Sequence, residues 1–163
     1  MTSAIWYRAD AYALDPANPM GRQSAGASFL RGWLRHAGLP TWYCAAPDGS
    51  QAQSFAATAQ AYVPGAQVKW IPPDRPAALA EAGGLFFPSP GLGFFAWQRR
   101  SIGQRAYSLC GITHTIASEN AMDQIADLLI APVQPWDAVI CTSGPVRAAV
   151  EAFLGPQAEH LAS

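Results

Sequence analysis

A histidine and several hydroxyl side chains follow two apolar segments that the sequence predicts to be strands. Residues 107–112 are an apolar run that leads into Thr113 and His114, and residues 138–141 are a second run that leads into Ser143. Ligands of parallel α/β sheets bind at the carboxyl ends of strands, and an imidazole can accept or donate a proton near neutral pH. His114 is therefore the catalytic candidate, and Thr113 and Ser143 are candidates for binding a ligand.

Each of these positions also has an ordinary structural interpretation, which the sequence leaves open. A histidine at a strand end can bond to a neighbouring carbonyl group, and a serine before Gly144-Pro145 can cap the helix that follows. The other two histidines, His36 and His160, lie far from His114 in the sequence, and none of the three has a cysteine or carboxylate at ligand spacing. We therefore expect no metal site.

A glycine-bearing segment, residues 19–26, precedes the first predicted helix. Glycine lets the backbone approach a ligand closely, and the start of a helix offers free N–H groups and a positive dipole end to an anion. Gly21 and Gly26 are the glycines concerned, but no Lys-Ser pair follows them, so the segment is not a P-loop. A ligand-binding loop and a flexible turn are equally supported here.

Three further features carry weaker signals. Residues 91–96 match the dinucleotide fingerprint G-x-G-x-x-A, but they follow a later strand and no acidic residue lies about 20 positions on. We interpret them as a loop with buried phenylalanines. The doublet Arg99-Arg100 is interpreted as part of a solvated face rather than an anion site, and Asp137 as a turn residue.

Strand-like and helix-like segments alternate along the chain. Strands are predicted at 4–8, 39–45, 67–71, 85–87, 107–112 and 138–141, and helices at 25–37, 55–63, 76–82, 94–102, 118–130 and 146–154. The strands are continuous apolar runs, which is typical of sheets covered on both faces. The order predicts an α/β fold: a Rossmann-like, doubly wound, mainly parallel sheet with helices on both faces. We expect one domain, 1–156, with 157–163 as a tail or the start of a linker.

Composition excludes several classes of function. The 163 residues carry a formal net charge of −1, half of them are hydrophobic, and only 13% are charged against about 25% in an average protein. Disorder, nucleic-acid binding and a polybasic membrane anchor are therefore disfavoured. So few charges also suggest a surface that something covers. No signal peptide or transmembrane segment is apparent, and the three cysteines resemble small buried residues. We expect a cytoplasmic protein.

Taken together, these segments resemble the N-terminal, acceptor-side domain of a GT-B glycosyltransferase of the group 1, family 4-like type. The likeness rests on residues 107–115, Tyr-Ser-Leu-Cys-Gly-Ile-Thr-His-Thr, and on residues 137–143, Asp-Ala-Val-Ile-Cys-Thr-Ser. It extends from the loop before the first long helix to about Leu154. The resemblance implies one half of a GT-B fold and a retaining transfer of sugar from a nucleotide-sugar donor to an acceptor.

The resemblance also implies roles for individual residues. Gly21 and Arg22 would approach the donor phosphates, His114 would approach the transferred sugar, and Thr113 and Ser143 would bind a donor phosphate or the acceptor. No metal or other cofactor is expected. The partner implied is a C-terminal donor-binding domain, which these residues do not include, so we expect this half to hold the acceptor and to be inactive alone. The alternatives are a stand-alone Rossmann-like domain that binds a nucleotide or small molecule, and an interaction module without a ligand.

Overall fold

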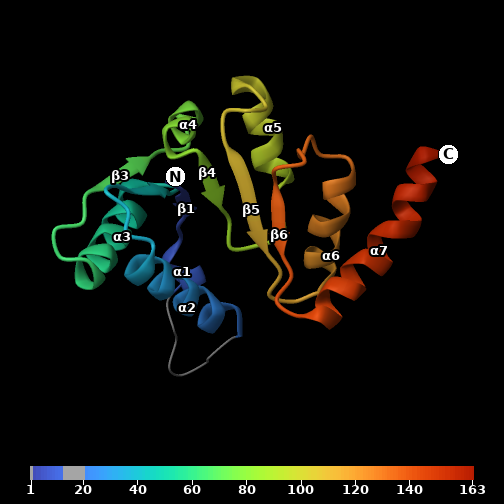
Figure 1. The fold of residues 1–163 in the computed structure, drawn as a ribbon, viewed down its shortest axis with the longest axis horizontal. Helices are drawn as coiled ribbons and strands as arrows, with labels where there is room; N and C mark the ends of the chain where they lie inside the picture. Colours follow the sequence, from blue (N-terminus) through green and yellow to red (C-terminus); the bar gives the residue numbers. More distant parts are fainter. Residues whose placement is uncertain (1, 13–20) are drawn as a thin grey trace. The chain divides into compact units, whose positions relative to one another are not determined.

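The computed structural model describes residues 2–12 and 21–163, except for the side chains of Gly21 and Arg22. The chain forms two compact units, Met1–Phe86 and Phe87–Ser163, and in both of them parallel strands alternate with helices (Figure 1). The predicted α/β class is therefore confirmed, and the parallel strands flanked by helices are consistent with a Rossmann-like fold.

The first unit contains four parallel strands in the order β3-β2-β1-β4. The strands are β1 (Ala4–Trp6), β2 (Trp42–Ala45), β3 (Val68–Ile71) and β4 (Gly84–Phe86), and the helices are α1 (Ala9–Tyr12), α2 (Gly21–His36), α3 (Gly49–Tyr62), η1 (Pro76–Ala78) and α4 (Leu79–Ala82). β1 lies between β2 and β4, so its partners shield it on both edges and Ala4 and Ile5 are fully buried.

Aromatic side chains attach α2 and α3 to the strands of the first unit. The ring of Trp33 on α2 lies edge-on to that of Trp42 on β2, 4.9 Å away, and also contacts Phe55 of α3. Phe29, one turn before Trp33, stacks on Phe86 of β4 at 3.9 Å. Aromatic pairs of this kind stabilise beyond the apolar area that they bury, so they hold α2 against β2 and β4 and hold α3 against α2.

The second unit contains β5 (Ser108–Ile112) and β6 (Ala138–Ile140), which pair in parallel with Gly111 opposite Val139. Its helices are α5 (Gly93–Ile102), α6 (Glu119–Ala126), η2 (Asp127–Leu129) and α7 (Gly144–Ala162). Across the described part of the chain, every helix is too short or too polar to cross a lipid bilayer.

Two helix boundaries differ from the prediction by six residues or more. α3 begins six residues earlier than expected, because the Asp48 carboxylate accepts hydrogen bonds from the backbone N–H groups of Ser50 and Gln51. α7 was expected to end at Gly155-Pro156, but it continues to Ala162. Proline removes one hydrogen bond from a helix, and in that turn the Gln157 side chain donates to the Phe153 carbonyl at 3.0 Å.

The expectation that every strand is covered on both faces is wrong for β3 and β6. Lys69 and Trp70 in the middle of β3 are exposed, and so are Ala138 and Ile140 of β6. Within its own unit, each of these strands pairs on one edge only, so fewer neighbouring groups shield it. An apolar run therefore identified the strand but not its burial.

Gly26, which the sequence placed in a ligand loop, lies inside α2 at its contact with α1. A Cβ at this position would overlap the carbonyl oxygen of Ala11 and come within 3.5 Å of the Tyr12 ring. Tyr12 in turn stacks on Tyr7 at 5.3 Å and donates a hydrogen bond to the Trp6 carbonyl. Gly26 is thus required for the close approach of two helices.

We predict that Gly26→Ala lowers the free energy of unfolding by about 1–3 kcal/mol, because α1 must move away from α2 to admit the methyl group. Gly32→Ala is the matched control on the same helix, since nothing lies within 4 Å of a Cβ there. That substitution should raise stability by about 0.5–1 kcal/mol. Urea denaturation measures both, and equal effects of the two substitutions would contradict the packing role of Gly26.

Burial also changes the chemistry of a thiol in the first unit. All three cysteines are free, Cys44 of β2 is fully buried, and Cys110 and Cys141 are half-buried. Desolvation raises the pKa of Cys44 from 9.0 to about 12. The prediction of burial therefore holds in full for Cys44 alone.

This shift predicts a loss of stability in alkali. Above about pH 9 the unfolded chain releases the Cys44 proton and the folded chain retains it until about pH 12, so stability falls across that interval, by up to about 1.4 kcal/mol per pH unit. Cys44→Ala should remove this part of the slope of unfolding free energy against pH, whereas Cys141→Ala should leave it. An unchanged slope in Cys44→Ala would show that the thiol ionises in the folded state.

Candidate functional site

The sequence candidates of the second unit gather at the carboxyl ends of β5 and β6. Thr113, the first residue after β5, is fully buried, and both its backbone N–H and its hydroxyl donate to the carbonyl of Ile140, at 3.0 and 3.2 Å. Its side chain therefore joins the two strand ends and has no surface for a ligand. Its effect on a site here would be to hold His114 and the segment after Ile140 in place.

His114 follows directly and is half-buried. Both of its ring nitrogens are shielded from solvent. A catalytic role for this imidazole therefore requires that the ring turn, or that residues over it move, when a substrate binds. The position at the end of a buried strand agrees with the sequence interpretation, and the role itself stays a prediction.

Ser143 lies at the start of α7, three residues after the end of β6. Its Oγ accepts a hydrogen bond from the N–H of Val146 at 3.3 Å, and its side chain is exposed. Of the two interpretations that the sequence left open, capping is therefore realised. The hydroxyl still faces solvent at a helix N-terminus, where an anion is favoured electrostatically, so a ligand role is compatible with the cap.

Two residues that sequence analysis did not select also lie at this edge of the unit. The segment after Phe86 runs beside β5, with Phe87 N donating to Cys110 O at 2.8 Å and Ile112 N to Ser89 O at 3.3 Å. The Ser89 hydroxyl is hydrogen-bonded to the side-chain amide of Gln124 on α6. Because Ser89 follows a proline-cut apolar run, its position after a strand was the signal available in the sequence.

Gly111 makes this arrangement possible. A Cβ on Gly111 would lie 2.6 Å from the carbonyl oxygen of Ser89 and 3.1 Å from the Leu92 side chain. Only glycine lets the 87–92 segment run so close to β5. The same segment supplies Ser89, so Gly111 determines which polar groups reach the carboxyl end of the strand.

Gly91 and Gly93, the glycines of the fingerprint-like segment, lie against side chains of the protein and do not line an open phosphate-binding loop. A Cβ on Gly91 would lie 2.8 Å from Gln124 Oε1, and one on Gly93 would overlap the Asp127 carboxylate. These glycines therefore admit α6 and η2 to close contact with the loop, which agrees with rejecting the dinucleotide interpretation. Of its two phenylalanines, Phe95 is buried as expected, whereas Phe94 is exposed, which corrects that part of the prediction.

The first-unit candidates lie partly outside the described residues. Residues 13–20, which include Pro19 and Met20 of the predicted glycine loop, are not described, nor are the side chains of Gly21 and Arg22. What is described is that α2 begins at Gly21, so both residues belong to its first turn. Their contact with donor phosphates therefore stays a prediction.

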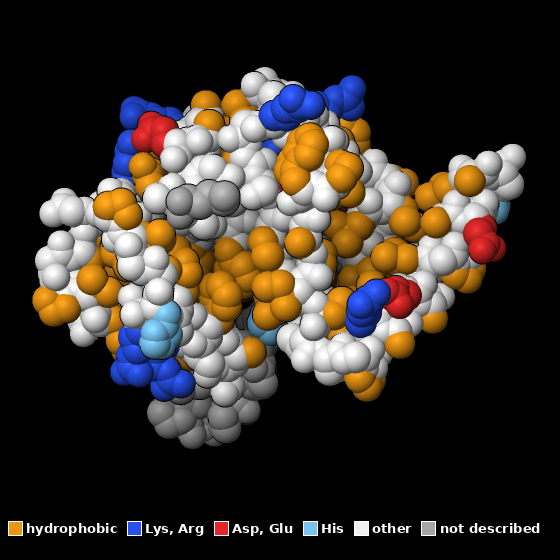
Figure 2. Space-filling view, in the orientation of Figure 1, with side chains coloured by type: hydrophobic (Ala, Val, Ile, Leu, Met, Phe, Trp, Pro, Cys, Tyr) orange, Lys and Arg blue, Asp and Glu red, His pale blue; other side chains and the backbone are white. Residues whose placement is uncertain are grey.

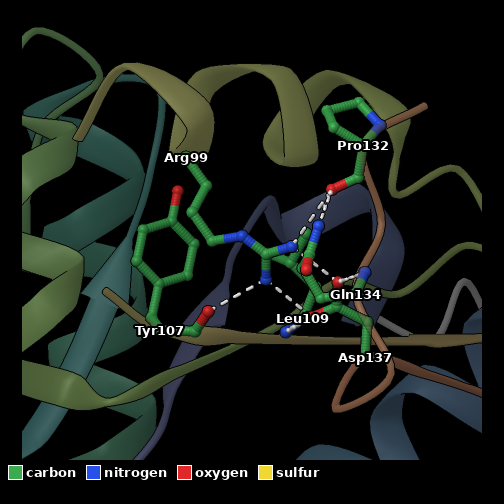
Figure 3. A network of polar contacts seen from close by, with 6 residues as sticks. All are labelled: Arg99, Tyr107, Leu109, Pro132, Gln134 and Asp137. Carbon is green, nitrogen blue, oxygen red and sulfur yellow. Dashed lines mark hydrogen bonds and ion pairs between the residues drawn. The ribbon is translucent and has the colours of Figure 1, made fainter. Parts of the chain in front are cut away.

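A buried ion pair holds the second unit together (Figure 3). Arg99 on α5 is fully buried and makes two hydrogen bonds of 2.6 Å to the two carboxylate oxygens of Asp137. The guanidinium also donates to the carbonyls of Tyr107 and Pro132, at 2.9 and 3.5 Å. The Asp137 carboxylate accepts from the N–H of Leu109, so the pair connects α5 to the start of β5 and to the turn before β6.

This network corrects two expectations. Arg99 does not belong to a solvated face; Arg100 does, and its guanidinium lies over the exposed ring of Trp97 at 5.4 Å. Asp137 is a turn residue, since it accepts from Gln134 N at 2.8 Å, but its main contribution is to neutralise a buried cation. The sequence shows the acid and the arginine 38 positions apart, and no local pattern connects them.

Burial of Tyr107 within this unit has its own consequence. Desolvation raises the pKa of Tyr107 to about 12, although the cation of Arg99, whose Cζ lies 5.9 Å from the ring centroid, acts in the opposite direction. The phenol is therefore neutral at physiological pH.

No family model, curated protein or solved structure matches the chain. Among the side chains of residues 2–12 and 23–163, no group of three or more His, Cys, Asp or Glu residues is placed to hold a metal ion.

We predict that Arg99→Met lowers the free energy of unfolding by about 3–5 kcal/mol, because it leaves the Asp137 charge buried without its partner. Asp137→Ala should cost a similar amount, since it also removes the acceptor for Leu109 N and Gln134 N. Arg100→Met, at the exposed neighbour, should change stability by no more than about 0.5 kcal/mol. Urea denaturation of the three variants decides the matter; an effect of Arg99→Met as small as that of Arg100→Met would exclude a structural role for the pair.

Proposed function

We propose that this chain is the acceptor-side domain of a GT-B-type glycosyltransferase that transfers a sugar from a nucleotide-sugar donor, with retention, to an acceptor. The observation that carries the proposal is the placement of His114, after the parallel strand β5, beside Thr113, which joins β5 to the end of β6. Ser143 follows that second strand end at the start of α7. In α/β folds this edge is where ligands bind.

The exposed apolar side chains of the second unit support an interface with another domain. β6 exposes Ile140, and α7 has 19 residues, none of which is buried. Large apolar side chains left at the surface are typical of sites that a partner covers. A C-terminal donor-binding domain is the partner that the proposal requires, and the low fraction of charged residues agrees with such a covered surface.

In this proposal the residues have distinct tasks. His114 would contact the transferred sugar after its ring is released, Thr113 would position it, and Ser143 with the first turn of α7 would bind an acceptor or a phosphate oxygen. Gly21 and Arg22, in the first turn of α2, would approach the donor phosphates. The Gln124–Ser89 pair supplies further hydrogen-bonding groups at the same edge as His114.

Glycosyl transfer from a panel of nucleotide sugars, measured with the protein expressed from its natural reading frame, tests the proposal. We expect His114→Ala to reduce kcat by about a hundredfold or more, if the imidazole acts on the transferred sugar, with an unchanged thermal unfolding temperature. His36→Ala is the control, because His36 is exposed at the end of α2, and it should retain full activity. The chain of residues 1–163 alone should show no transfer.

Three outcomes separate this proposal from the others. Equal activity of His114→Ala and His36→Ala would exclude a catalytic role for His114. Tight binding of a nucleotide by residues 1–163 alone, with no transfer by the natural protein, would favour a small-molecule-binding domain. Absence of both transfer and nucleotide binding would favour an interaction module.

A further inference from the structure

One helix of the second unit presents aromatic side chains to solvent. On α5, Phe94 is 68% exposed and Trp97, three residues further on, is 50% exposed. The opposite side of the same helix is anchored by Phe95, Ala96 and Arg99, which are buried. Residues three apart lie on one face of a helix, so the two aromatic rings form an outward face on a helix whose other side is fixed.

Cations accompany these rings. Arg100 lies over the Trp97 ring, with 5.4 Å between its Cζ and the ring centroid, and Arg105 is exposed in the turn after α5. Figure 2 shows hydrophobic and cationic side chains next to each other over α5. Arg99 adds no free charge to this surface, because Asp137 neutralises it.

Carboxylates are scarce along this part of the chain. No Asp or Glu occurs between Glu81 and Glu119, an interval that contains three arginines. Asp127 lies against Gly93 in the first turn of α5, at the end of the helix away from Arg100. Exposed Phe, Trp and Arg side chains with no acid among them are complementary to a partner surface that is both apolar and anionic.

We propose that the aromatic–arginine face of α5, formed by Phe94, Trp97 and Arg100, docks the protein on an anionic lipid bilayer, with Arg105 in the turn that follows the helix as a second cation. Trp and Phe are the side chains that enter the boundary between headgroups and acyl chains, where a helix lies in the plane of the membrane. Arginine keeps its charge among the anionic headgroups while its stem packs on apolar neighbours. The docking is peripheral, and α5 is already folded and held by its buried side.

This docking does not depend on the proposed transferase function. Where both hold, an acceptor that is itself lipid-linked is the substrate class brought closest to the protein. The two proposals fail separately. Vesicle binding is measured without any sugar donor, and glycosyl transfer is measured without vesicles.

Co-sedimentation of residues 1–163 with lipid vesicles tests the docking. We expect binding to phosphatidylcholine vesicles that contain phosphatidylglycerol, and much weaker binding to phosphatidylcholine alone. Phe94→Ser combined with Trp97→Ser should lower the partition coefficient by about tenfold or more. Arg100→Gln and Arg105→Gln should each lower it by about fivefold on the anionic vesicles only.

Matched controls exist in the same unit. Ile130 is 66% exposed and Trp136 is 43% exposed, and neither lies on α5; Ile130→Ser and Trp136→Ser should leave partitioning unchanged. A blue shift of tryptophan fluorescence on anionic vesicles should disappear in Trp97→Phe and persist in Trp136→Phe. Circular dichroism confirms that each variant is folded, and centrifugation without vesicles corrects for self-association.

Several results would overturn the proposal. They are no sedimentation with anionic vesicles, equal losses from the α5 variants and the control variants, or binding that does not depend on phosphatidylglycerol. The proposal would also be overturned if the protein does not bind vesicles but forms a dimer in solution that Phe94→Ser and Trp97→Ser dissociate. The aromatic–arginine face would then be a protein interface.

Discussion

The second unit depends on one charge placed where no water reaches it. A guanidinium in a protein interior is strongly unfavourable unless a carboxylate neutralises it and further acceptors take its hydrogen bonds, and the two terminal nitrogens of Arg99 bond to a bidentate carboxylate and two carbonyl groups. Three segments must therefore be present at once for the pair to form: α5, the first residues of β5 and the turn that leads into β6. His114 and Ser143 lie after the carboxyl ends of β5 and β6. The Arg99–Asp137 pair fixes the opposite ends of the same two strands, and in this way it helps to position the candidate site.

The alternation of strands and helices was predictable because it depends on local patterns. Apolar runs bounded by glycine and proline located the six strands of the described residues within a few positions, and periodic apolar positions located most helices. The early start of α3 was missed because its first turn is polar and is defined by the Asp48 cap. Burial was predicted less well, since whether a strand is covered depends on its neighbours. The exposed faces of β3 and β6 show this.

The candidate site was predictable in position and less so in composition. His114, Thr113 and Ser143 were found because each follows a strand, and they do lie where strands end. The use of each hydroxyl was not predictable, because Thr113 bonds across to Ile140 and Ser143 bonds within its own helix. Long-range partners such as Arg99 with Asp137, or Ser89 with Gln124, leave no periodic or spacing signal. The glycines were similarly ambiguous. Gly26, Gly91 and Gly93 are needed because another segment of the protein packs closely against each of them, and a sequence motif does not show such contacts.

The exposed strand β6 has a consequence for how this chain behaves at high concentration. Within the second unit β6 pairs with β5 alone, and its three residues Ala138, Val139 and Ile140 include no proline or charged side chain. An unprotected strand edge offers backbone N–H and carbonyl groups to any other extended segment. This edge is therefore a place where copies of the chain can pair with one another, and a lysine among these three residues would oppose that pairing.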